Sequence, residues 1–423
     1  MRASLQPLRE PGFRPLVTGF FVNELGDWFG SVALAILVFD QTGSPLATAG
    51  LFMATQFLPA FLAPPLVARL ELLRSGRALP WVYAAEALVF GLLALIAAEF
   101  ALVAVIALAA IDGALASAAR ALSRATAAAL LAPRGELRAG NGLLNIGFTF
   151  GAAAGPALAG FAVAAWGAQA ALLADAASFL LVAAHVTRVP GLELAASEAS
   201  PWADRLRAGL TYVRARADLR RLILAEGAAI VFFALVIPIE VVFALETLDA
   251  GDAGYGALLA SWGVGMLLGA LLFTGLRDRS LRALLAVSTL TIGLAYLATA
   301  AAPSLLVACV AALVGGIGNG IQWVALVSAV QELTEQRYQA RVVSVLESAA
   351  SAAPGIGFLA GGAIAALFDP RASFAVAGAG VLIVLALAAI GLRGTRLGER
   401  PHVPQRRAET ESSPFPDPIH SPP

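Results

Sequence analysis

The chain has 423 residues, of which 59% are hydrophobic and only 13% are charged, and its mean hydropathy is +0.81. A soluble domain carries about 25% charged residues, so this composition excludes an ordinary soluble protein. The formal net charge is zero, and no nucleic-acid partner is expected. Apolar runs of roughly 20 residues, each long enough to cross a hydrocarbon core of about 30 Å, recur along almost the whole chain. The sequence therefore predicts an all-α polytopic membrane protein in a lipid bilayer.

Twelve apolar runs, taken in chain order, predict twelve transmembrane helices. They are separated by charged or Pro/Gly-rich breaks and lie near 15–39, 46–68, 79–97, 100–123, 140–164, 168–188, 219–245, 254–275, 282–300, 304–328, 340–366 and 372–392. The longest polar break divides them into six and six. We therefore expect a tail (1–14), an N-terminal six-helix half (15–188), a linker (189–218), a C-terminal six-helix half (219–392) and a disordered tail (393–423).

The linker contains Trp202 and several Arg residues. It is interpreted either as an amphipathic segment on the membrane surface or as a solvated loop. Both interpretations stay open at this point.

The distribution of charge predicts the orientation. All 28 basic residues are Arg, and every one except Arg371 falls in a tail, in an even-numbered loop or near its flanking helix ends. The odd-numbered loops instead hold acids: Asp40, Glu99, Glu246, Asp249, Asp252 and Asp369. Because basic residues near helix ends are retained on the cytoplasmic side, both termini are expected in the cytoplasm of a protein of the inner (cytoplasmic) membrane.

Enzyme chemistry and cofactors have little support in the sequence. The single cysteine, Cys309, permits neither a disulfide nor a cysteine metal cluster within one chain. Only three His are present, and no H-E-x-x-H or G-x-S-x-G motif occurs. Without Lys, a Walker phosphate-binding loop is impossible. No catalytic activity, metal or cofactor is expected.

Two glycine-rich stretches reveal an internal repeat. Gly151, Gly155, Pro156 and Gly160 in predicted helix 5 lie over Ala353, Gly357, Phe358 and Gly362 in predicted helix 11. Two six-helix halves related in this way are typical of transporters with internal repeats, in which the substrate site lies between the halves near the midplane.

Three segments carry a resemblance to a known family: FRPLVTGFFVNELGDWFGSVALAILVFDQTGSP, NGLLNIGFTFGAAAGPALAGFAVAAWG and RVVSVLESAASAAPGIGFLAGG. They resemble the major facilitator superfamily over nearly all of residues 13–392. More narrowly, they are similar to the branch that includes enterobactin exporters and macrolide efflux proteins. The resemblance implies a major facilitator fold, usually monomeric.

The resemblance also assigns conformational motifs. Gly275, Asp278, Arg279 and Arg282 look like a degraded form of the superfamily loop signature, in which the Asp pairs with Arg across the half interface. The corresponding first-half stretch, 68–77, lacks an Asp at the expected place, which puts a first-half latch in doubt. The helix 5 series Gly151, Gly155, Pro156 and Gly160 resembles the signature of antiporting exporters, although glycines at this spacing also serve general helix packing.

Ionisable residues at membrane depth cost at least roughly 2.5–3.5 kcal/mol, so each needs a partner, a wet cavity or a function. In the superfamily that the chain resembles, helices 1, 4, 7 and 10 line the central cavity. These predicted helices carry most of the deep polar side chains: Glu24, Asp27, Asp112, Arg120, Glu226, Glu240, Asn319 and Gln322. Glu347 in helix 11 is a further candidate for the cavity edge or for a local pair.

Three acids near the midplane are the candidates for proton coupling: Glu24, Asp27 and Asp112. Glu24 and Asp27 are three residues apart on one helix face, and two adjacent carboxylates favour a proton that comes and goes. The alternatives are a fixed pair with Arg120 or Arg124 that only orients helices, or direct contact with substrate.

Other charged residues are expected to have structural roles. Arg120 and Arg124, placed near the inner end of helix 4, are expected to extend toward the cytoplasm. Glu86 and Asp175 are expected to cap or pin helices away from the cavity.

Together these features predict a secondary active transporter that exports a small amphiphilic molecule, such as a siderophore, a macrolide or another drug-like compound, in exchange for protons by alternating access. An uptake permease or a lipid mover of the same fold is the alternative, since fold does not determine direction or cargo. A non-transporting membrane sensor or assembly factor is the alternative from another class.

Overall fold

The structure is a computed structural model that describes residues 3–70, 75–190, 202–276, 279–335 and 338–391. Helices dominate the described chain. The N-terminal half begins with a 3-10 turn and contains α1 (Phe13–Thr42), α2 (Pro45–Phe52), a π turn (Met53–Phe57), α3 (Pro59–Leu70), α4 (Ser75–Ile96), α5 (Leu102–Leu131) and α6 (Leu137–Val186).

The C-terminal half begins after the linker helix α7 (Trp202–Ala215). Its elements are α8 (Ala217–Ala234), a 3-10 turn (Ile237–Ile239), α9 (Glu240–Val242), a π turn (Phe243–Thr247), α10 (Gly251–Gly275), α11 (Leu281–Ala300), α12 (Leu305–Glu332), α13 (Gln339–Leu367) and α14 (Pro370–Gly391). The seventh span is therefore an interrupted helix, in which α8 and α9 are joined through Pro238.

Eleven described helices are long and apolar enough to cross a membrane. One of them, α6, has 50 residues, which at 1.5 Å per residue is about 75 Å and more than twice a hydrocarbon core. Gly167 interrupts it with φ 81° and ψ 160°, a conformation open chiefly to glycine. The chain reverses there, so α6 supplies two spans, as the predicted break between 164 and 168 requires. The predicted all-α, twelve-span architecture is confirmed.

One predicted helix end is wrong. The fourth span was expected to end at residue 123, but α5 continues to Leu131 and a 3-10 turn extends to Arg134. The charges of Arg120 and Arg124 suggested a helix boundary. The stretch that follows is rich in alanine, the residue with the highest helix propensity, so the helix continues. Arg120 therefore lies well inside the span.

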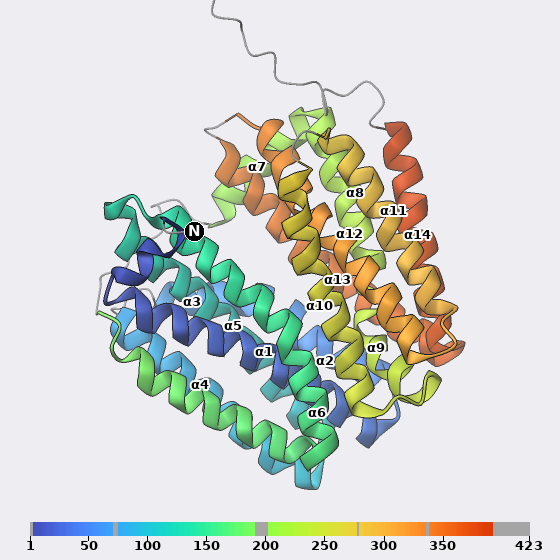
Figure 1. The fold of residues 1–423 in the computed structure, drawn as a ribbon, viewed down its shortest axis with the longest axis horizontal. Coiled ribbons are helices and arrows are strands. Elements are labelled where there is room, and N and C mark those ends of the chain that lie inside the picture. Colours follow the sequence, from blue (N-terminus) through green and yellow to red (C-terminus); the bar gives the residue numbers. More distant parts are fainter. Residues whose placement is uncertain (1–2, 71–74, 191–201, 277–278, 336–337, 392–423) are drawn as a thin grey trace, which may run out of the picture.

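The two halves converge at one end of the bundle, remote from the N-terminus (Figure 1). A Cβ atom built on Gly160 of α6 would lie 2.5 Å from the Asp252 carbonyl oxygen of α10, and one on Gly256 would lie 2.4 Å from the Pro156 carbonyl oxygen. Between α2 and α13, a Cβ on Gly362 would lie 2.7 Å from the Cβ of Ala49. These glycines let helix backbones of opposite halves touch.

The interface glycines lie nearer the end of the bundle that carries the acidic loops, here named the acidic face (Asp40, Glu99, Glu246, Asp252 and Asp369). The opposite end, named the basic face, carries Arg9, Arg14, Arg134, Arg138, Arg188, Arg216 and Arg220. The two halves are thus in closest contact near the acidic face.

Arg371, the exception to the charge pattern, has a local structural role at the acidic face. Its guanidinium donates to the carbonyl oxygens of Ala300, at 2.6 Å, and Ala302, at 2.8 Å, at the end of α11. Those carbonyls have no partner within their own helix, and a cation is favourable at a helix C-terminus. Arg371 therefore caps α11.

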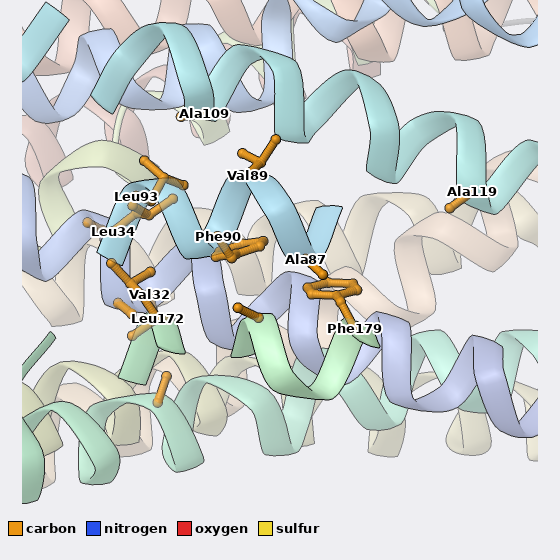
Figure 2. Close-up of a cluster of buried hydrophobic side chains, with 14 of the residues drawn as sticks. Val32, Leu34, Ala87, Val89, Phe90, Leu93, Ala109, Ala119, Leu172 and Phe179 are labelled. Carbon is orange, nitrogen blue, oxygen red and sulfur yellow. The ribbon is translucent and has the colours of Figure 1, made fainter. Parts of the chain in front are cut away.

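The core of the N-terminal half is built from α1, α4, α5 and the second part of α6. Figure 2 shows Val32, Leu93 and Leu172 together, with Phe90 and Phe179 close by. The rings of Phe90 and Phe179 stack with centroids 5.4 Å apart. A Cβ on Gly30 would lie 2.4 Å from the Phe90 ring. This tight packing sets the rotation of each helix and hence the direction of its polar residues.

The linker helix α7 packs on the C-terminal half. A Cβ on Gly209 would lie 2.6 Å from the Arg341 carbonyl oxygen of α13. The Tyr212 and Tyr338 rings stack at 4.3 Å, and Arg216 pairs with Glu335. The described part of the linker is therefore a packed helix, whereas residues 191–201 and the predicted tail from 393 lie outside the described residues.

Candidate functional site

Six ionisable side chains gather inside the N-terminal half, and we name them the acid–arginine cluster: Glu24, Asp27, Glu86, Asp112, Arg120 and Asp175. They come from α1, α4, α5 and the second part of α6. Glu86, for example, is within electrostatic range of four other members: Asp27, Asp112, Arg120 and Asp175. Four helices thus contribute to one polar centre at membrane depth.

Arg120 is the central member of the cluster. Its Nη1 lies 2.8 Å from Asp27 Oδ2 and 3.7 Å from Glu24 Oε2. The Asn23 amide donates to the same Asp27 oxygen at 3.2 Å. The Arg120 side chain is 33% exposed and that of Asp27 is 11% exposed, whereas that of Glu24 is fully buried. Asp27 and Arg120 therefore form the open side of the cluster.

The remaining acids lie deeper. Glu86 is 0% exposed, and neither of its carboxyl oxygens has a hydrogen-bond partner among the described residues; the same holds for both Glu24 carboxyl oxygens. An unpaired ionised carboxylate is very costly to bury. One arginine balances one carboxylate charge, so the four buried acids and the partly exposed Asp27 cannot all be ionised at once without cations besides Arg120. Charge balance therefore implies that at least some of these carboxyl groups carry a proton.

Two glycines of α1 allow Asp175 to reach the cluster. A Cβ on Gly26 would lie 2.8 Å from Asp175 Oδ1, and a Cβ on Gly30 would lie 2.6 Å from Asp175 Oδ2. Ser178 donates to Asp175 Oδ1 at 3.2 Å. Without side chains at these positions, α1 and the second part of α6 approach closely enough to bury an acid between them.

Glu86 and Asp175 were expected to cap or pin helices away from the cavity, and the structure buries both of them inside the acid–arginine cluster. Both lie in the middle of their helices and inside the cluster. Helical spacing carries the signal that was missed: Tyr83, Glu86 and Phe90 recur at three and four residues, so they share the buried face of α4. An acid on the same face as two buried aromatic rings points into the core.

The expectation for Arg120 is also corrected. It does not extend to the membrane surface, because α5 continues for eleven residues beyond it and Asp27 and Glu24 hold its guanidinium. Arg124 fits the expectation better, since it is exposed and donates to Asn145 Oδ1 at 3.3 Å. Two arginines on one helix face thus differ in environment.

In the C-terminal half, Glu226 of α8 accepts a hydrogen bond from the Gln322 amide of α12 at 3.2 Å. Both residues line a partly open pocket with about 100 Å³ of water-accessible space. Its walls come from α8, α11, α12 and α14, and it also includes Arg282. Sequence analysis predicted the two polar residues but not the pocket.

The other predicted residues are not brought into one site. Glu240 begins α9 within electrostatic range of Tyr255 and Tyr296, and Asn319 is half-buried on α12. Gly275 ends α10 with no heavy atom within 4 Å of its built Cβ, and Arg279 is exposed beyond it. Asp278 and the Glu347 side chain lie outside the described residues.

The helix 5 glycine series has two partners. Cβ atoms built on Gly151 and Gly155 would lie 2.7 Å from the Glu24 carbonyl oxygen and from Trp28 Cβ of α1, respectively. Further along α6, Gly160 meets α10 of the other half, and so does the Pro156 carbonyl oxygen. The series therefore links the helix that bears Glu24 and Asp27 to the interface between the halves.

A family model described as transmembrane secretion effector matches residues 2–415. The chain belongs to this family of major facilitator transporters. A search of curated proteins found no significant match to this chain.

Solved structures of transporters share this fold. A variant of the nucleoside transporter NupG has a TM-score of 0.70 at 14% identity, with 89% of this chain and 99% of that chain covered. A bacterial homologue of the iron transporter ferroportin in the inward-facing state has a TM-score of 0.69 at 17% identity, with 90% and 98% covered. The human organic anion transporter MFSD10 (TETRAN) has a TM-score of 0.59 at 20% identity, with 89% and 100% covered.

Family membership identifies this secretion effector family member as a multi-pass membrane protein and a secondary transporter of the major facilitator type. Proteins of this class move small molecules across membranes, and membership in it favours a transporter over an enzyme.

Proposed function

We propose that this protein exports a small amphiphilic molecule in exchange for protons by alternating access, as a monomer. The observation that carries the proposal is the acid–arginine cluster. Four buried carboxylates and the partly exposed Asp27, with Arg120 among them, need further positive charge, which protons can supply. Asp27 and Arg120, its partly exposed members, give protons a way in.

The cluster is positioned to influence the shape of the transporter. Glu24 and Asp27 lie on α1, and the Glu24 carbonyl is in direct contact with Gly151 of α6. The same α6 forms the contact with α10 that holds the halves together. A change of charge on α1 therefore acts on a helix that carries the interface. Protonation would favour one arrangement of the halves and deprotonation the other.

Direction and cargo rest on other features. The description of the family as secretion effectors favours export. The concentration of Arg at the basic face favours a cytoplasmic position for that face in the inner membrane. A largely apolar pocket with few polar groups, such as that around Glu226, suits an amphiphile such as a siderophore, a macrolide or another drug-like compound.

Inside-out vesicles that contain the full chain test this function. When respiration acidifies their lumen, a radiolabelled macrolide or catecholate siderophore is expected to accumulate inside, and the lumen should become less acidic when the substrate is added. Vesicles without the protein are the control. Accumulation in right-side-out vesicles driven by an inward proton gradient would instead identify an uptake permease, and no gradient-driven movement in either preparation would refute the proposal.

Alternating access requires the acidic face to open, and Gly256→Leu tests this step. The side chain would collide with Pro156 and Gly160 of α6, so the halves should be held apart at the acidic face and transport should stop. A cysteine at Ala49, in a Cys309→Ser background, reports opening because Ala49 is buried against Gly362 of the other half. We expect Gly256→Leu to increase its labelling by an impermeant maleimide added on the acidic side.

Gly91→Leu is the matched control for this substitution. Gly91 is also a helical glycine, but no heavy atom lies within 4 Å of its built Cβ. It should leave transport and labelling unchanged. Full transport by Gly256→Leu would mean that the contact between α6 and α10 takes no part in the cycle.

A further inference from the structure

The internal repeat relates the pocket in the C-terminal half to the acid–arginine cluster in the N-terminal half. The displacement of 202 positions that superposes Gly155 on Gly357 also carries Glu24 to Glu226 and Arg120 to Gln322. In both halves, the donor from the fourth helix of the half faces the acid from the first: Arg120 lies 3.7 Å from Glu24, and Gln322 lies 3.2 Å from Glu226. The two sites are thus equivalents on the repeat.

The same displacement accounts for the empty space. Asn23, Asp27 and Tyr83 of the N-terminal half correspond to Ala225, Ala229 and Leu285, and all three of these smaller or less polar residues line the pocket. Where the N-terminal half is filled by polar side chains, the C-terminal half has a hollow. The hollow is partly open, so a ligand could enter it from outside the half.

The two sites also differ in charge: the acid in the C-terminal half has less positive charge beside it than its equivalent in the N-terminal half. Glu24 has the guanidinium of Arg120 nearby, whereas Glu226 has only the neutral amide of Gln322. Arg282 lines the same pocket from the start of α11, but it forms no ion pair with Glu226 in the described part of the chain. The residues that α14 contributes are apolar: Val384, Leu385, Ala388 and Ala389. The pocket therefore has an acid and an apolar wall, and its lining arginine, Arg282, is not paired with that acid as Arg120 is with Glu24.

We infer that Glu226 binds the positive charge of an amphiphilic organic cation, whose apolar body occupies the pocket between α8, α11, α12 and α14. The bound cation stands in for the guanidinium that the N-terminal half supplies from its own chain. A proton can also occupy the Glu226 carboxylate, so proton and ligand compete for one site. This inference rests on the proposed function and names the charge class of its substrate.

Equilibrium binding of radiolabelled tetraphenylphosphonium to the purified full chain in detergent tests the inference without any gradient or transport. The wild type should bind the probe, and neutral triphenylphosphine oxide should compete poorly. Glu226→Gln removes one partner of a buried charge pair and should weaken binding by roughly thirtyfold. Glu246→Gln, which neutralises an exposed acid on the same span, should leave binding unchanged.

Gln322→Arg provides an independent variant. It reproduces the arginine of the N-terminal half, so its guanidinium should pair with Glu226 and exclude the probe while the protein keeps its thermal stability. Wild-type binding should also weaken as the pH falls, because protons then occupy Glu226. Unchanged probe affinity in Gln322→Arg, or affinity independent of pH in the wild type, would overturn the inference.

The outcomes separate this inference from the proposed function. If Glu226→Gln binds the probe as tightly as the wild type, the pocket is not a cation site, while proton-driven export of other amphiphiles in vesicles can still hold. If the probe binds as expected but vesicles show no proton-driven export, the proposed function fails and the binding site remains.

Discussion

Replacing Asp27 by Asn together with Glu24 by Gln is expected to reduce pH-gradient-driven transport to the level of vesicles that lack the protein. The amides keep the shape of the carboxyl groups but can neither release nor take up a proton. Arg120 retains Glu86 and Asp112 within electrostatic range, so the helices should stay packed. The loss should therefore reflect coupling to protons.

The measurement that separates coupling from folding is exchange of labelled for unlabelled substrate across the membrane without a gradient. The double variant should retain this exchange, because it requires binding and alternating access but no net proton movement. Glu99→Gln, an exposed acid of the acidic face, should retain both activities. Full gradient-driven accumulation in the double variant would remove Asp27 and Glu24 from the coupling mechanism and leave them as an orienting pair with Arg120.

Replacing Arg120 by Gln is expected to destabilise the folded protein by about 1–3 kcal/mol, because Arg120 and Asp27 are partly exposed and the loss falls between that of an exposed pair and that of a fully buried one. The loss should be largest at high pH, where the carboxylates are ionised. It should shrink as the pH falls, because protonation removes the charge that Arg120 balances. Unfolding of the purified protein in detergent, followed by tryptophan fluorescence, measures the difference.

Arg124→Gln is the matched control for this prediction, because Arg124 lies four residues further along α5 but is exposed and bonds only Asn145 among the described side chains. It should cost less than about 1 kcal/mol. Adding Asp27→Asn to Arg120→Gln should recover part of the stability by removing a carboxylate that has lost its partner. Equal destabilisation by Arg120→Gln and Arg124→Gln would contradict a central role for Arg120 in the charge balance.

The spans and the break between the fifth and sixth of them follow from the sequence, because a bilayer demands about 20 apolar residues per crossing and water-exposed loops are polar. Gly167 marks the turn within α6, and the charge asymmetry separates the two faces of the bundle. The relation between the halves is also visible in the chain itself, since the displacement from Gly155 to Gly357 needs no coordinates.

Which residues belong to each polar site could be decided only from the tertiary structure. Glu24, Asp27 and Asp112 could be selected by depth alone, but Glu86 and Asp175 join them only because packing turns α4 and α6 so that these acids face α1. The sequence left open whether Arg120 or Arg124 pairs with these acids, and only the structure shows that Arg120 pairs with Asp27.

By itself the sequence determined that this protein crosses a membrane twelve times in two related halves, since hydrophobic length and charge are properties of the chain. Only the tertiary structure decided which acids share a centre and that Glu226 borders a hollow. The rotation of each helix about its axis and the volume left between side chains are set by neighbours that are distant in the chain, and no local pattern contains them.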